Sequence, residues 1–191
     1  MPDEIAIPRL PRQVEDNPVA ASLLQILKAR PRQLWDESAI HVPTLELSSP
    51  LGQALRHVGR AQLVVRGLEG ATKTLTDEAR GLEIAEAKSE TPRSPRVSRL
   101  LLLANDGTRR FYRQVETLIK YHGDRLLVLV LDADEATFGE CVFGANAVAR
   151  AALVTKKSAV ADILIACVTP AREPSEVWAM ATKVKAERGE E

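Results

Sequence analysis

The sequence contains little cysteine and no excess of charge of either sign. Two cysteines, Cys141 and Cys167, stand among its 191 residues, which is too few and too widely spaced for a disulfide framework or a zinc site. Lysine plus arginine and aspartate plus glutamate each number 26. The net charge therefore argues against a simple polyanion binder, although a neutral total is compatible with one basic face. A reducing compartment is the default expectation.

Long apolar runs and targeting signals are also missing. No apolar run approaches the roughly 20 residues that a membrane-spanning helix needs. Asp3 and Glu4 stand near the N-terminus, and no apolar stretch typical of a secretory signal accompanies them. We therefore expect an intracellular protein without a membrane partner.

The sequence lacks the motifs of the common nucleotide-binding and metal enzymes. Neither G-x-x-x-x-G-K-[ST] nor G-x-G-x-x-G occurs. His41, His57 and His122 are isolated and show no metal-ligand spacing. Asp132 and Asp134 follow an apolar run, at the end of a strand where α/β enzymes place catalytic groups, but no third acid or nucleophile accompanies them. We interpret them as solvated loop acids and expect no enzymatic activity, metal or cofactor.

What the chain does have is the balance of a globular protein, with 45% hydrophobic and 27% charged residues. Its length suits one domain with extensions. Residues 1–49 predict an N-terminal arm with one short helix, which opens at Asn17-Pro18. Residues 168–191 predict a C-terminal helical tail.

Residues 50–167 alternate between helical and strand patterns. The runs at 99–104 and 126–131 are apolar on both faces, which is typical of central strands. Residues 77–98 carry charge, serine and proline without periodicity and predict an inserted loop. The alternation indicates an α/β protein, and more specifically an α/β/α three-layer sandwich.

One turn in this domain stands out. A strand-like run ends in Arg66-Gly67 and passes at once into a helix. Glycine lets a backbone approach a ligand closely, and a helix N-terminus directs amides at anions. The turn is therefore either a tight connection or a place for a polyanion.

Three stretches in order resemble the kink-turn RNA-binding ribosomal-protein superfamily of the L-seven-Ae and L-thirty-e type. They are LVVRGLEGATKTL, RLLLLANDG and TFGECVFG with the later ARAALVT, and the resemblance covers about residues 50–167. It implies a non-catalytic, RNA-binding component of a ribonucleoprotein particle such as the ribosome, a snoRNP or ribonuclease P. Structured RNA and other subunits of the particle would be its partners, in the nucleolus, the cytoplasm or an organelle.

The resemblance also implies which residues contact RNA. The first group lies at the turn and comprises Arg66, Gly67, Leu68, Glu69, Gly70, Thr72 and Lys73. The second comprises Phe143, Gly144 and Asn146, where Phe143 either stacks on an unpaired base or plugs the core.

Arginines suggest a third contact, independent of the turn. Arg109 and Arg110 open a predicted helix. With Arg93, Arg96, Arg99 and Arg113 they form either a phosphate-contacting stripe or an ordinary charged surface.

Two positions depart from the family pattern. Glu69 and Gly70 stand where the family has Asn and Glu, and a carboxylate cannot donate the hydrogen bond that an amide donates. We therefore expect a standard kink-turn to bind weakly. The alternative function is a protein–protein scaffold of such a particle that has lost sequence-specific RNA reading, with Trp35 and Trp178 in docking elements.

Overall fold

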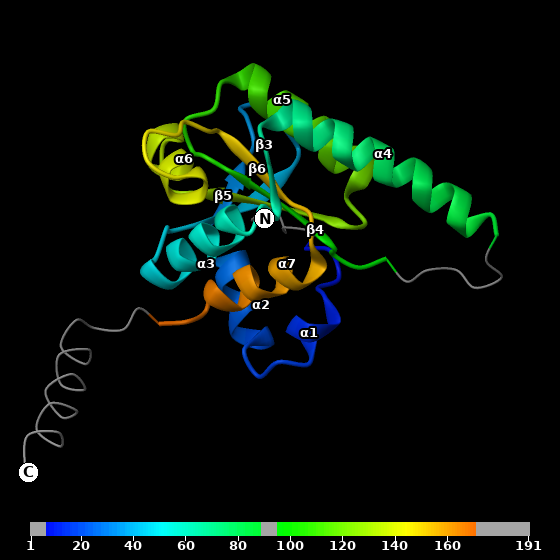
Figure 1. Ribbon diagram of the computed structural model, residues 1–191, viewed down its shortest axis with the longest axis horizontal. Helices are drawn as coiled ribbons and strands as arrows, with labels where there is room; N and C mark the ends of the chain where they lie inside the picture. Colours follow the sequence, from blue (N-terminus) through cyan, green and yellow to red (C-terminus); the bar gives the residue numbers. More distant parts are fainter. Residues whose placement is uncertain (1–6, 89–94, 171–191) are drawn as a thin grey trace, which may run out of the picture.

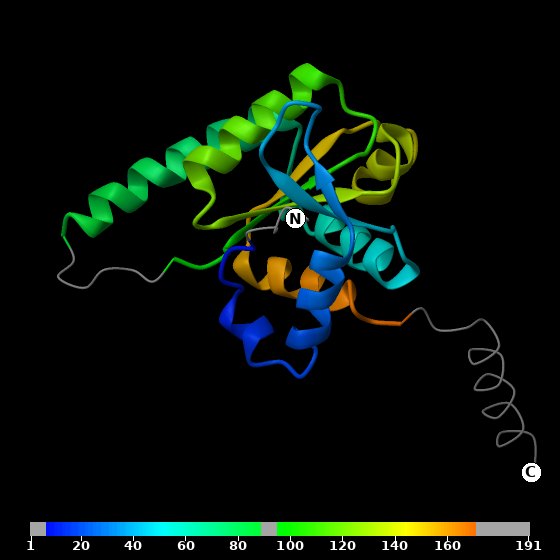
Figure 2. The ribbon, with the colours of Figure 1, turned by 180° about the vertical axis from the view of Figure 1, so that it is seen from behind.

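The computed structural model describes residues 7–88 and 95–170. Over these ranges it confirms the predicted α/β/α sandwich, since a six-stranded mixed sheet lies between two layers of helices (Figures 1 and 2). No helix within the described ranges is both long and apolar enough to cross a membrane.

The sheet has the strand order β1-β2-β5-β4-β6-β3. Its strands are β1 (Pro31–Gln33), β2 (His41–Leu45), β3 (Val64–Arg66), β4 (Arg99–Leu103), β5 (Leu126–Leu131) and β6 (Ala151–Val154). The helices are α1 (Arg12–Glu15), α2 (Ala20–Ala29), α3 (Ser49–Arg60), α4 (Leu68–Glu86), α5 (Arg109–His122), α6 (Glu135–Phe143) and α7 (Lys157–Ala166).

The two runs predicted as central strands are central. Strands β4 and β5 pair in parallel over five residues, and all six residues of β5 are buried. Alternate side chains of β4 lie on opposite faces of the sheet. Leu101 and Leu103 belong to the apolar cluster formed with α4 and α5. Leu100 and Leu102 belong to the cluster on the other face, which includes residues of α1, α2, α3, α6 and α7. The continuous apolar runs are required because helices cover both faces.

The N-terminal segment is not an arm, and that prediction was wrong. Leu23 and Leu27 of α2 are fully buried in the core, and β1 and β2 form a hairpin that extends the sheet. Two prolines obscured the strand pattern. Pro31 lies in the edge strand, and Pro43 lies outside the short ladder that β2 makes with β5, so neither missing N–H disrupts that ladder.

The predicted loop at 77–98 is also wrong over its first half, because α4 continues to Glu86. Glu78 anchors the middle of the helix through ion pairs with Arg99 at 2.9 Å and Arg125 at 2.8 Å. The C-terminal part of the helix projects from the body (Figures 1 and 2), and Ile84 near its end is 60% exposed. The helical tail predicted at 168–191 lies, from residue 171 on, outside the described residues.

A close crossing of α3 and α6 generates a stability prediction. A Cβ at Gly59 would lie 1.7 Å from the backbone oxygen of Val142, whereas one at Gly81 in α4 would meet nothing within 4 Å. Gly59→Ala should lower the free energy of unfolding by about 1–3 kcal/mol because the helices must separate. The control Gly81→Ala should raise it by roughly 1 kcal/mol through helix propensity. Urea unfolding measures both, and an unchanged Gly59→Ala variant would contradict the packing described.

Candidate nucleic-acid interface

The pairing of β6 brings two of the predicted groups together. Strand β6 runs antiparallel to both β4 and β3, so its beginning lies beside the ends of its neighbours. The N–H of Gly67 donates to the carbonyl of Ala151 at 2.9 Å. The β3–α4 turn and the α6–β6 loop therefore lie side by side at one edge of the sheet.

Gly67 is the N-cap of α4 and has φ 80° and ψ 161°, a backbone conformation available essentially to glycine alone. No side chain caps this helix, whereas Ser48, Thr108 and Asp134 cap α3, α5 and α6. A Cβ on Gly67 would meet nothing within 4 Å. The turn is thus open to solvent, and the first amides of α4 lie behind it.

Arg66 and Phe143 lie next to the Gly67 turn and contact each other. The Arg66 guanidinium lies 5.5 Å from the centre of the Phe143 ring and donates to the carbonyl of Val148. Phe143 is half-buried and packs against the core. Its ring is therefore both a core contact and a support for Arg66, and a base could stack here on the guanidinium plane.

The loop after Phe143 turns sharply through two left-handed residues. Gly144 ends α6 with φ 98°, and Asn146 has φ 61°. The Asn146 N–H donates to the Glu140 carboxylate at 3.3 Å. This turn brings exposed backbone next to the Gly67 turn.

Three side chains in the first turns of α4 point to solvent, and each is differently engaged. The Thr72 hydroxyl donates to the Leu68 carbonyl at 2.8 Å. Lys73, with its side chain 83% exposed, lies 4.0 Å from Asp77. The Glu69 carboxylate makes no hydrogen bond or ion pair within the described residues.

Gly70 has a packing reason for its identity. A Cβ there would lie 2.7 Å from Cγ1 of Val65, too close for two carbon atoms. The small residue lets the start of α4 lie directly over the end of β3. A glutamate at this position, as in the family pattern, would require Val65 to move.

Arg109 holds the hairpin to α5. It forms an ion pair with Glu37 at 2.7 Å, and its guanidinium lies 4.8 Å from the Trp35 ring. Arg113 lies over the same ring at 5.7 Å. Arg110 is exposed and makes no hydrogen bond or ion pair to any described residue. Of the two predicted arginines, only Arg110 is fully available to a ligand.

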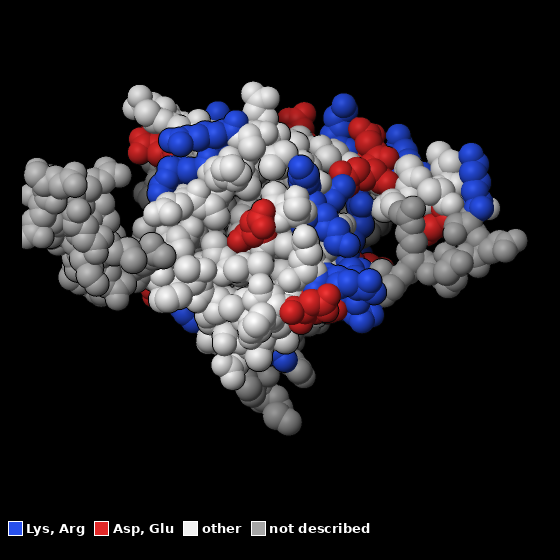
Figure 3. Space-filling view, turned by 60° about the horizontal axis from the view of Figure 1, so that its bottom comes forward, with Lys and Arg blue, Asp and Glu red and all other residues white. Residues whose placement is uncertain are grey.

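Of the two alternatives left open for the arginines, a single phosphate-contacting stripe does not form. Arg96 forms an ion pair with Glu15, and Arg99 forms one with Glu78. Both arginines lie at or just before the beginning of β4, whereas Arg109 and Arg110 follow its other end. Arg93 lies outside the described residues. On the face seen in Figure 3, basic side chains gather in separate groups, several with acidic neighbours. Arg96 and Arg99 are thus engaged within the protein, since partly buried charges need partners.

Sequence reasoning missed the most buried charge near this surface. Glu116 of α5 is 8% exposed and accepts a hydrogen bond from the Trp35 indole N–H. Lys120, one turn on, lies 2.7 Å away. Lys120 and then Trp35 hold the pKa of Glu116 below its usual value, although burial opposes them. The i, i+4 spacing of Glu116 and Lys120 was the available signal.

The two acids considered for catalysis have structural partners. Asp134 caps α6, accepting from the Thr137 N–H at 2.7 Å, and this bond lowers the Asp134 pKa. Asp132 accepts from the Asn105 amide at 2.9 Å and lies 3.6 Å from Arg30. Over residues 7–88 and 95–170, no group of three or more His, Cys, Asp or Glu residues could hold a metal ion.

No protein-family model matches the chain, and no curated protein matches it. Among solved structures it is similar to a protein of unknown function from Bacillus halodurans, at 13% identity and a TM-score of 0.43, over 63% of this chain and 97% of that one. It is also similar to a 15.5kD RNA binding protein from Giardia lamblia, at 16% identity and a TM-score of 0.42, over 69% and 87% respectively. Likenesses of this size carry no conclusion about function.

The Trp35–Glu116 contact generates a pH prediction. Because the folded-state pKa of Glu116 is lowered, its stabilising contribution is present above the unfolded-state pKa and is lost as the pH falls through the folded-state value. Wild type should therefore exceed Glu116→Gln in unfolding free energy at pH 7, and the difference should shrink below about pH 4.5, the ordinary pKa of glutamate. Urea unfolding between pH 7 and pH 3 measures it; a constant difference would contradict this role.

Proposed function

We propose that this protein is a non-catalytic RNA-binding component of a ribonucleoprotein particle. The observation that carries the proposal is the open, uncapped beginning of α4 at Gly67, which lies beside a guanidinium held over an aromatic ring. Backbone amides at a helix N-terminus attract phosphate, and Arg66 adds a positive charge next to them. Phosphate contact and base stacking are the two interactions that single-stranded RNA requires of a protein.

The path of the RNA follows from the charges. Glu69 repels phosphate on the side of α4 that faces α5, whereas Arg66 attracts it on the side of β6. We therefore expect the backbone to cross the Gly67 turn from the Gly144–Asn146 loop, with Lys73 and Arg110 as flanking contacts. Phe143 acts through Arg66, whose guanidinium it supports for stacking on an unpaired base.

Reading of a standard kink-turn is not part of this proposal. Gly70 packs against Val65, and Glu69 lacks an amide donor. The RNA is instead a structured one with at least one unpaired base. Asp132 forms an ion pair with Arg30, and Asp134 caps α6. Because both acids have structural partners, they support a role without catalysis.

One observation favours the second candidate, a protein–protein scaffold. The outer half of α4 projects from the sheet, and its Ile84 is 60% exposed. The projecting helix thus offers an apolar side chain that a protein partner can reach, away from the cations of the Gly67 turn.

Charge reversal tests the interface. Arg66→Glu should raise the Kd for an RNA hairpin with an unpaired loop by about tenfold or more, since one lost charge contact and one new repulsion exceed about 1.4 kcal/mol. The matched control is Arg80→Glu, the same change on the projecting half of α4, which should alter the Kd by less than about twofold. Fluorescence anisotropy measures binding, and thermal unfolding checks the fold. Equal effects of the two variants would refute the location; failure of wild type to bind any RNA would favour the scaffold.

Salt dependence tests the flanking contacts. Each phosphate contact contributes about 0.7–0.9 to the slope of log affinity against log salt concentration. Replacing Lys73 and Arg110 together by Ala should therefore flatten the slope by about 1.4–1.8. Replacing Arg80, on the projecting part of α4, together with Lys88, just after the end of that helix, should leave the slope unchanged. An unaltered slope in the first variant would remove both residues from the interface.

A further inference from the structure

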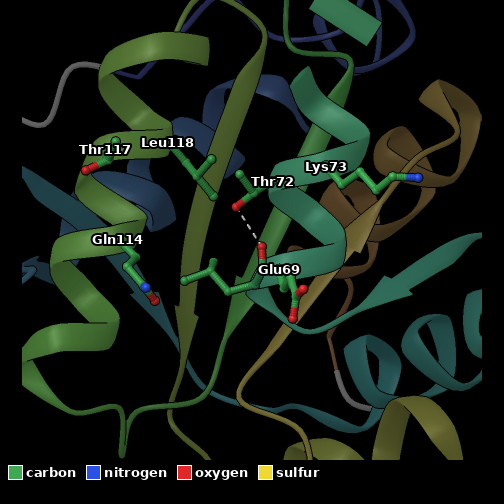
Figure 4. A pocket seen from close by; sticks show the side chains of 7 residues that line it. Glu69, Thr72, Lys73, Gln114, Thr117 and Leu118 are labelled. Atoms are coloured by element: carbon green, nitrogen blue, oxygen red, sulfur yellow. Dashed lines mark hydrogen bonds between the residues drawn. The ribbon is translucent and has the colours of Figure 1, made fainter. Parts of the chain in front are cut away.

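A groove of about 710 Å³ lies between the first turns of α4 and the middle of α5 (Figure 4). Its most buried lining residues are Leu118, 4% exposed, and Leu68, which packs against the same apolar cluster. Its polar lining comprises Glu69, Thr72 and Lys73 from α4, and Gln114 and Thr117 from α5. Its size is in the range of small-molecule sites, and it opens directly beside the Gly67 turn.

The polar side chains that line this groove differ in whether they already make hydrogen bonds within the protein. The hydroxyls of Thr72 and Thr117 donate to carbonyls of their own helices. The Glu69 carboxylate and the Gln114 amide make no hydrogen bond or ion pair within the part of the chain that is described. The Glu69 carboxylate, in the first turn of α4, interacts favourably with the helix dipole. Its oxygens can still accept hydrogen bonds from a ligand.

We propose that this groove binds an unpaired guanine of the RNA held at the Gly67 turn. The inference rests on the proposed function and extends it to α5, which sequence analysis did not connect with recognition. The two leucines provide apolar contact for the face of the base. The unpartnered groups at the rim then determine which base is accepted.

Guanine satisfies these groups better than the other bases do. A carboxylate only accepts, and guanine alone offers it two adjacent donors, N1–H and the N2 amino group. The O6 and N7 atoms of guanine accept from an amide such as that of Gln114. Adenine and cytosine each present an acceptor beside their single amino group, and uracil offers one donor between two carbonyls. A phosphate gains little net attraction in the groove, because the Glu69 carboxylate offsets the charge of Lys73, which also lines it and lies 4.0 Å from Asp77.

The test compares base preference with binding itself. Four RNA hairpins with identical stems carry a uridine loop that contains one guanine, inosine, adenine or no purine. Wild type should bind the guanine loop at least about tenfold more tightly than the adenine loop, with inosine between them because it lacks the N2 amino group. Glu69→Gln should lose most of this preference, and Gln114→Leu should reduce it. The control Glu83→Gln, on the projecting part of α4, should keep it.

The outcomes separate this inference from the proposed function. Equal binding of the four hairpins, or an unchanged guanine preference in Glu69→Gln and Gln114→Leu, would overturn the guanine site while RNA binding at Gly67 stands. A guanine preference that Gln114→Leu reduces without a change in thermal stability supports the site, because this residue lies away from the α4 terminus. Absence of binding to any hairpin would overturn both.

Discussion

Strand β6 determines where the candidate interface forms, because it runs antiparallel to both of its neighbours. This single pairing turns the chain so that a loop leading into β6 meets turns that follow β3 and β4. The Gly67–Ala151 hydrogen bond closes the contact. A parallel β6 would place its loop at the opposite edge, and the basic and aromatic residues would then lie on different ends of the molecule. The interface is thus a consequence of strand direction.

The neutral composition is explained by how the charges are used. Arg96, Arg99 and Arg125 are largely buried and paired with glutamates that hold the projecting α4 and the N-terminal segment to the sheet. Arg109 pairs with Glu37. Three cations surround the candidate interface, namely Arg66 and Lys73 at the beginning of α4 and Arg110 in the first turn of α5. An equal number of acids and bases therefore leaves room for a small basic surface.

The fold class and the central strands could be predicted because β4 and β5 are continuous apolar runs, which indicate strands that helices cover on both faces. The turn at Gly67 was also predictable, since a strand, a glycine and a helix follow one another directly. The β1–β2 hairpin could not be, because its strands are short and contain proline. Nor could the partners of Arg96 and Arg99, since ion pairs between residues distant in sequence leave no periodic signal. Gln114 became a candidate only once α4 and α5 lay side by side.

Mapping of RNA crosslinks tests the central claim most directly. A pool of structured RNAs that contain 4-thiouridine would be bound to the full chain and irradiated, and mass spectrometry would identify the crosslinked peptides. The account predicts crosslinks in peptides that span the β3–α4 turn and the α6–β6 loop, both at the edge where β6 begins. Crosslinks confined to α1, α2 and α7, or an absence of crosslinks at saturating RNA, would contradict it.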